Sequence, residues 1–92
     1  MNTSELFHQS LSKVKPEIKN EMDISFAIAD KLDMILKEKG LSQKEFAKQI
    51  GKTEPEVSRW LSGSHNFTIR TIAKLSVFLN EDIISIRQQV SK

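Results

Sequence analysis

Few side chains in this 92-residue chain are of the types that carry out catalysis or bind metals. Cysteine is absent, which excludes disulfides, thiolate metal sites and cysteine nucleophiles. The two histidines, His8 and His65, lie far apart, and neither a His-Glu-x-x-His pattern nor a glycine-rich phosphate loop occurs. Asp30 and Asp33 fit an ordinary solvated helix face. We therefore expect no enzymatic activity, no metal and no cofactor.

Hydroxyl and carboxylate residues instead mark two helix starts close together. Ser42 and Glu45, and again Thr53 and Glu56, have the spacing of a capping box. In that motif the cap side chain and the Glu side chain each accept a hydrogen bond from the other residue's backbone N–H. The sequence therefore predicts two helices that begin eleven residues apart.

Gly51 lies between the two boxes and can end the first helix in the left-handed conformation. Two short helices, 42–50 and 53–61, would then be joined by a tight turn. Residues 42–62 are thus predicted to form a helix-turn-helix. Such a unit places its second helix in the major groove of DNA, with that helix's N-terminal residues nearest the base edges.

The second helix would turn Val57 and Leu61 toward the core and the opposite face toward solvent. The residues on that outward face are Glu54, Pro55, Ser58, Arg59 and Ser62. Arg59 is the strongest candidate for base recognition, because its guanidinium can donate two hydrogen bonds to guanine O6 and N7. Alternatively, Arg59 pairs with Glu56 or covers Trp60, and Ser58 is simply solvated. Trp60 itself fits a core position better than a DNA contact.

Acids on this face complicate the prediction, because a carboxylate near DNA costs electrostatic energy unless it accepts a hydrogen bond from cytosine N4 or points away. Glu56 has a separate role in the capping box. Of the two roles open to Glu54, interaction with the helix dipole fits slightly better than contact with cytosine. Pro55 has no N–H and can make only apolar contacts, such as with a thymine methyl group.

Donors around the recognition helix could bind DNA phosphates. Gln43 begins the helix that would cross the DNA backbone, where its amide and the helix N–H groups form an anion site. Further donors come from the surrounding turns: Lys44, Lys52, Asn66, Thr68 and Arg70. The complete set of predicted DNA-binding residues is Gln43, Lys52, Thr53, Glu54, Pro55, Ser58, Arg59, Ser62, His65, Asn66 and Thr68.

The elements that must position these residues are all helical. A long helix over 17–39 would end at Gly40 and bury Ile24, Ile28, Leu32, Ile35 and Leu36. A fourth helix begins at the Thr68 cap, carries Ile69, Ile72, Ala73, Leu75, Ser76 and Leu79, and closes at Asn80. A fifth could begin at Asp82 and carry Ile83, Ile84, Ile86 and Val90, although β-branched residues also fit a less regular tail. Those isoleucines could form a dimer seam or close the core.

Residues 1–16 are predicted to form a separate amphipathic extension before the domain of residues 17–92. Leu6, Phe7, Leu11 and Val14 fall on one face of this extension, which could contact a partner protein, a second copy or the protein's own core. With three Gly and two Pro, the chain has too few turn signals for a sandwich or barrel. We expect an all-α fold: a five-helix domain with a short extra N-terminal helix.

Charge is unevenly distributed along the chain. Residues 1–36 hold four Lys against six acids and carry −2. Because the net charge of the chain is +2, residues 37–92 carry +4. A basic C-terminal part favours a polyanionic partner. No apolar stretch approaches the roughly 18 residues needed to span a bilayer, and no secretion signal is evident, so a cytoplasmic location is expected.

Residues 41–51, LSQKEFAKQIG, and residues 57–63, VSRWLSG, resemble the phage-repressor/Cro type of helix-turn-helix, also called the xenobiotic-response-element family. The resemblance covers roughly residues 23–84. It implies phosphate contact by Gln43, a groove-facing surface at Glu54, Pro55, Ser58 and Arg59, and backbone contacts from residues 64–68. It also implies a lambda-repressor-like fold of four or five helices and a homodimer on palindromic double-stranded DNA.

Residues 58–68, SRWLSGSHNFT, are more narrowly similar to antitoxins of the HigA type. That likeness implies an autorepressing antitoxin paired with a small ribonuclease toxin in a toxin-antitoxin operon. Two alternatives stay open: a stand-alone phage-like transcriptional regulator, and a protein-interaction module that has lost DNA binding.

Overall fold

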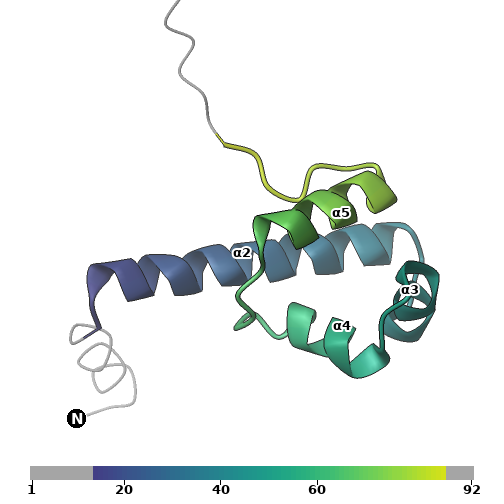
Figure 1. The fold of residues 1–92 in the computed structure, drawn as a ribbon, viewed down its shortest axis with the longest axis horizontal. Helices are drawn as coiled ribbons and strands as arrows, with labels where there is room; N and C mark the ends of the chain where they lie inside the picture. Colours follow the sequence, from purple (N-terminus) through teal and green to yellow (C-terminus); the bar gives the residue numbers. More distant parts are fainter. Residues whose placement is uncertain (1–13, 87–92) are drawn as a thin grey trace, which may run out of the picture.

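The computed structural model describes residues 14–86, which contain four helices and no strand (Figure 1). The helices are α2 (Pro16–Glu38), α3 (Gln43–Ile50), α4 (Glu54–Leu61) and α5 (Ile69–Leu79). The all-α prediction is confirmed over this range. The predicted N-terminal helix falls almost entirely on residues 1–13, outside the described part. None of the four helices is long and apolar enough to cross a membrane.

The long helix α2 is bounded by residues that suit its two ends. Pro16 occupies its first turn, where no N–H is needed, and Glu17 lies near its positive end. At the other end Gly40 adopts a positive φ of 68°, and Leu41 N–H donates to the Leu36 carbonyl at 2.9 Å. The predicted helix over 17–39 is therefore confirmed to within one residue.

The helix-turn-helix is built from α3, α4 and the turn at Gly51. Ser42 forms the complete capping box: Glu45 N–H donates to Ser42 Oγ at 3.1 Å, and Ser42 N–H donates to Glu45 Oε1 at 3.2 Å. Gly51 has φ 71°, and Lys52 N–H donates to the Ala47 carbonyl at 2.8 Å. The capping box fixes where α3 begins, and the hydrogen bond of Lys52 fixes how the chain leaves α3.

The second predicted capping box is only half formed. Thr53 Oγ1 accepts from Glu56 N–H at 3.3 Å, but no return hydrogen bond joins Thr53 N–H to the Glu56 carboxylate. The Thr53 side chain is thus the only side-chain cap of α4. Pro55 lies in the first turn of α4, where its missing N–H costs nothing.

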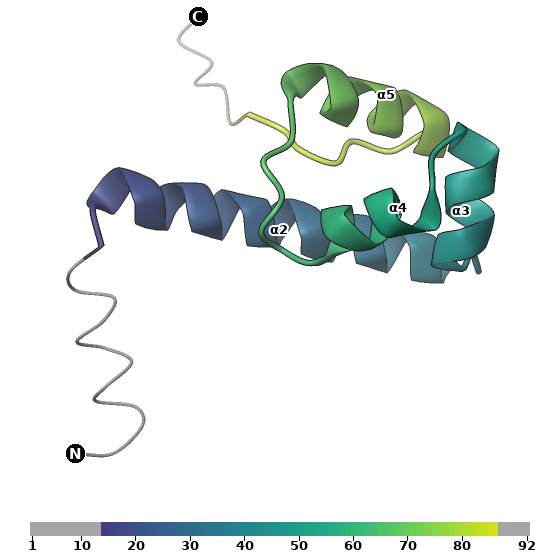
Figure 2. The same cartoon turned by 60° about the horizontal axis from the view of Figure 1, so that its bottom comes forward.

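Helices α3, α4 and α5 pack around the C-terminal half of α2, whose first half extends beyond them (Figures 1 and 2). The most deeply buried side chains are Leu32, Ile35, Phe46, Val57 and Leu79. The prediction that Ile24 belongs to the core is wrong, because its side chain is 44% exposed. Every residue from 15 to 24 is exposed, since this part of α2 lies outside the packed region.

Helix α5 begins and ends as predicted, at the Thr68 cap and at Asn80, which has φ 55°. Ile69 was expected among its packed residues but is 85% exposed. It lies in the first turn, on a different side of the helix from Leu75 and Leu79, which enter the core.

The predicted fifth helix is absent from the part of it that the structure describes, residues 82–86. Ile83 instead enters the core with 6% exposure, and its N–H donates to Ser76 Oγ at 3.3 Å. Ile84 and Ile86 are 45% and 84% exposed, and Val90 lies outside the described residues. The five-helix count is therefore not matched, because Asn80 turns the chain back and β-branched residues follow.

Gly63 lets the loop after α4 pass close to α2. Its φ is 91°, and a Cβ at this position would collide with the ring of Phe26 on α2. A Cβ at Gly51 would meet nothing within 4 Å, so only the positive φ requires glycine there. Glycine is therefore required at position 51 for its backbone conformation alone. At position 63 it is also required by the close contact with Phe26.

We predict that Gly51→Ala lowers the free energy of unfolding by about 1–2 kcal/mol, the usual cost of a left-handed L-residue. Gly63→Ala should lower the free energy of unfolding by more than Gly51→Ala does, because the methyl group also displaces Phe26. Urea unfolding followed by circular dichroism measures both variants. Equal losses in the two variants would contradict the steric role of Gly63.

Glu45 should make stability depend on acid pH. Hydrogen bonds from the side chain and backbone N–H of Ser42 hold the pKa of Glu45 below its ordinary value. The ionised form therefore stabilises the folded protein fully above the ordinary Glu pKa of about 4.3. That stabilisation is lost as the pH falls through the lowered pKa.

We predict that wild type is more stable than Glu45→Gln at neutral pH and that the difference vanishes in acid. Glutamine keeps a hydrogen-bond acceptor but lacks the charge, so the comparison isolates ionisation. Urea midpoints measured from neutral pH into acid provide the test. Glu38→Gln, at an exposed carboxylate with no hydrogen bond among the described side chains, is the matched control. A pH-independent difference for Glu45→Gln would rule out the charge-dependent cap.

Candidate DNA-binding surface

Helix α4 divides its side chains between the core and solvent as its periodicity predicted. Val57 is fully buried and Trp60 is 6% exposed, which agrees with a core position for the indole. Leu61 is partly buried against the same cluster. The five residues predicted to face outward are all exposed: Glu54, Pro55, Ser58, Arg59 and Ser62. The packing of one face of α4 thus presents the other face to solvent.

Gln43 joins this face from the neighbouring helix. A shallow groove is lined by Gln43 at the start of α3 and by Glu54, Pro55 and Ser58 on the first turns of α4. The capping box at Ser42 and the turn at Gly51 bring these two helix starts together. A donor at the N-terminus of one helix therefore lies beside the exposed start of the next.

Arg59 and Ser62 differ in the ion pairs and hydrogen bonds that their side chains already form. Arg59 is exposed, and no ion pair joins it to Glu56 or to another acid within residues 14–86. The Ser62 hydroxyl donates to the Arg59 carbonyl at 2.6 Å and accepts from Ser64 N–H at 3.3 Å. The guanidinium is therefore available for a ligand, whereas Ser62 already closes the end of α4.

The loop that follows carries the other predicted contacts. The His65 ring is half-buried and meets Phe67 edge-on, with ring centroids 4.7 Å apart. Thr68 Oγ1 accepts from Thr71 N–H at 3.1 Å. Asn66 is exposed and lines a groove with the first half of α2, separate from the groove of Gln43. These three residues are thus held by the loop and α5 rather than by α4.

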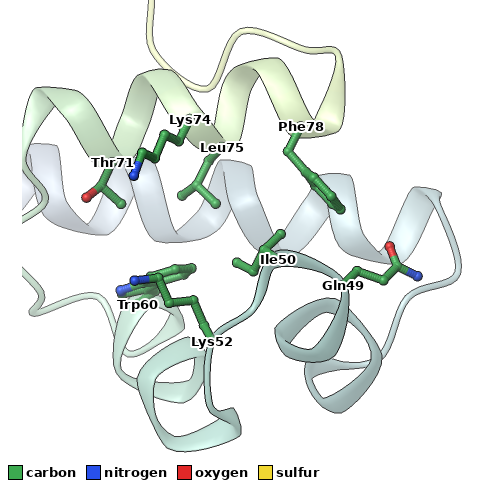
Figure 3. A pocket seen from close by; sticks show the side chains of 8 residues that line it. All are labelled: Gln49, Ile50, Lys52, Trp60, Thr71, Lys74, Leu75 and Phe78. Carbon is green, nitrogen blue, oxygen red and sulfur yellow. The ribbon is translucent and has the colours of Figure 1, made fainter.

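Lys52 is exposed in the turn and lines a different pocket, with Trp60 and residues of α5 (Figure 3). Several residues of this pocket were not singled out by the sequence: Gln49, Thr71, Lys74 and Phe78. No local pattern could have found Thr71, Lys74 and Phe78, because α5 begins well beyond the turn in the sequence. The cationic surface beside the helix-turn-helix therefore includes Lys74.

The other predicted contacts are only partly covered by the described residues. Leu6, Phe7 and Leu11 lie outside them, and Val14 is half-buried. No group of three or more His, Cys, Asp or Glu side chains that could hold a metal occurs within residues 14–86.

A family model described as helix-turn-helix matches residues 32–86, more than half of the chain and the whole of the unit formed by α3 and α4. Neither a comparison with curated proteins nor one with solved structures gives a match. The exposed face of α4 and the glycine turn between α3 and α4 are what this family match predicts. The chain belongs to the Cro/C1-type helix-turn-helix family of DNA-binding transcriptional regulators.

Proposed function

We propose that this protein is a sequence-specific repressor that inserts α4 into the major groove of double-stranded DNA. The observation that carries the proposal is the outward face of α4, where Ser58 and Arg59 are exposed and Ser58 shares a groove with Gln43 from α3. Recognition helices of this class place their first turns against base edges. The first turns of α4 are the part of the helix that shares a groove with α3.

Arg59 supplies the main base contact in this proposal. Its guanidinium is exposed and forms no ion pair within the described residues, so binding guanine would not break an existing salt bridge. Its planar donors match guanine O6 and N7. Ser58, one residue earlier and equally exposed, adds a hydroxyl for a base edge or a phosphate.

Phosphate contacts come from the residues around α4. Gln43 offers its amide at the start of α3, where unpaired backbone N–H groups also favour an anion. Lys52 is exposed in the turn, and Thr53 lies beside it as the cap of α4. His65, Asn66 and Thr68 extend the same role into the next loop. Such contacts orient the protein but do not select sequence.

Glu54 is the feature that favours the alternative, an interaction module without DNA binding. It is exposed in the first turn of α4, where its charge suits the helix dipole but opposes phosphate. Glu56 is half-buried and presents less charge to a ligand. Lys52 in the turn and Arg59 on α4 are exposed cations close to Glu54 in the sequence, and they support DNA binding over this alternative.

Homodimerisation on a palindromic site is part of the proposal. Exposed apolar side chains on α5 and the following segment support it: Ile69, Val77 and Ile86 are each more than 80% exposed. Apolar groups this exposed favour association with another surface. A dimer would present two copies of α4 to successive major grooves.

An antitoxin role is a second proposal and rests on the likeness of residues 58–68 to HigA-type antitoxins. In it, the extension of residues 1–16 binds a small ribonuclease toxin through Leu6, Phe7, Leu11 and Val14. Among the described residues, the core is formed by α2 to α5 together with Ile83.

We predict that Arg59→Ala weakens binding to the DNA upstream of its own gene by about 1–3 kcal/mol and relaxes specificity at one base pair. Arg59→Lys should recover charge but not specificity. Fluorescence anisotropy with specific and scrambled duplexes, at two salt concentrations, measures both, and sedimentation gives the number of chains per duplex. Lys15→Ala, an exposed lysine before α2, is the control.

Unchanged affinity and specificity in Arg59→Ala would remove the assigned role of this residue. Binding that is indifferent to both sequence and salt would instead favour the interaction module, because phosphate contacts weaken steeply as salt rises.

For the antitoxin role we predict that the tagged protein co-purifies with the product of a small toxin-like reading frame beside its gene. Phe7→Asp should abolish the complex, because an unpaired carboxylate would enter an apolar contact. Arg59→Ala should retain the toxin while losing DNA. If the wild-type protein formed no such complex, the antitoxin role would be rejected and only the role of transcriptional regulator would remain.

A further inference from the structure

A pocket of about 330 Å³ lies between α5 and the turn of the helix-turn-helix (Figure 3). Its apolar lining comes from three helices: Ile50 ends α3, Trp60 lies on α4, and Leu75 and Phe78 lie on α5. Its volume falls at the lower end of the range for small-molecule sites, roughly 300–1,000 Å³. A one-ring ligand is therefore of the right size.

Aromatic rings held by the core form much of this lining. Phe46 is fully buried, with its centroid 6.4 Å from that of Trp60 and 6.0 Å from that of Phe78. Trp60 and Phe78 are thus positioned by a common neighbour. Phe78 is nevertheless 44% exposed, so part of its ring is open to a ligand. Edge-to-face or offset contact with a flat aromatic ring would cover this exposed surface.

The polar side of the pocket is cationic. Lys52 approaches from the turn and Lys74 from α5, and Figure 3 shows both among the side chains that line the pocket. No acidic residue lines the pocket, and neither lysine forms an ion pair with another described residue. The backbone of Lys52 is fixed by its hydrogen bond to the Ala47 carbonyl. Two ammonium groups beside aromatic rings favour a ligand that joins an aromatic ring to an anion.

We propose that this pocket binds a small aromatic carboxylate. The ring lies against Trp60 and Phe78, and the carboxylate lies between the ammonium groups of Lys52 and Lys74. Lys52 is also a proposed phosphate contact, so the bound carboxylate competes with DNA for this lysine. The competition rests on the proposed function, whereas ligand binding does not.

Fluorine NMR of para-trifluoromethylbenzoate, with and without the full-length protein, tests the site. The neutral probe para-trifluoromethylbenzyl alcohol has the same ring without the charge. The double variant Lys52→Met/Lys74→Met removes both pocket cations while keeping unbranched side chains that are one heavy atom shorter. Lys15→Met/Lys39→Met, at two exposed lysines outside the pocket, makes the same change in net charge. Circular dichroism verifies the fold of each variant.

The proposal predicts saturable binding of the benzoate that is tighter than that of the alcohol. The pocket variant should weaken benzoate binding about three- to tenfold, as expected for two exposed ion pairs, and the control variant should not. Equal binding of the two probes, non-saturable binding, or equal effects of the two double variants would overturn the site.

DNA titrations with and without the benzoate test the competition separately. A weaker apparent DNA affinity of wild type, but not of the pocket variant, supports the shared use of Lys52. Benzoate binding with unchanged DNA affinity would overturn the competition alone. Absence of DNA binding under all conditions would count against the proposed function and leave the NMR result standing.

Discussion

The burial of Phe46 is the interaction on which the arrangement of the smaller helices depends. Its side chain is completely buried on α3 and meets Trp60 on α4 and Phe78 on α5. One ring thus relates the two helices of the helix-turn-helix to each other and to α5, while the C-terminal half of α2 supplies the surface beneath them. Loss of a buried Phe side chain typically costs about 3–5 kcal/mol, a large share of the stability of a small domain.

The helix starts could be predicted because their signals are local. Ser42, Thr53 and Thr68 each cap a helix through hydrogen bonds to a residue three positions later. Gly40 and Gly51 ended helices where a left-handed residue was expected. In each case the interacting groups lie within one turn of each other in the sequence, so the pattern contains the physical cause.

Predictions that depended on tertiary packing were less successful. Ile24 and Ile69 have the periodicity of core residues, but both are exposed because the other helices do not cover those parts of α2 and α5. Ile83 was assigned to a helix and instead reaches the core from an irregular segment. On α4 the outward face was predicted correctly, since burial of Val57 determines the opposite side. The pocket lined by Lys74 and Phe78 could not be predicted, because only folding brings α5 to the turn.

The hydrogen bonds of Ser76 influence how the segment after α5 detaches from the domain. Its hydroxyl donates to the Ile72 carbonyl at 2.8 Å and accepts from Ile83 N–H at 3.3 Å. Burial of one isoleucine is worth about 1.5–3 kcal/mol and one such hydrogen bond about 0.5–1.5 kcal/mol. Detachment of residues 81–86 therefore costs less than global unfolding, which is typically about 5–15 kcal/mol. This segment forms its own unit of local stability, and its amides should exchange with solvent through openings that leave α3 and α4 folded.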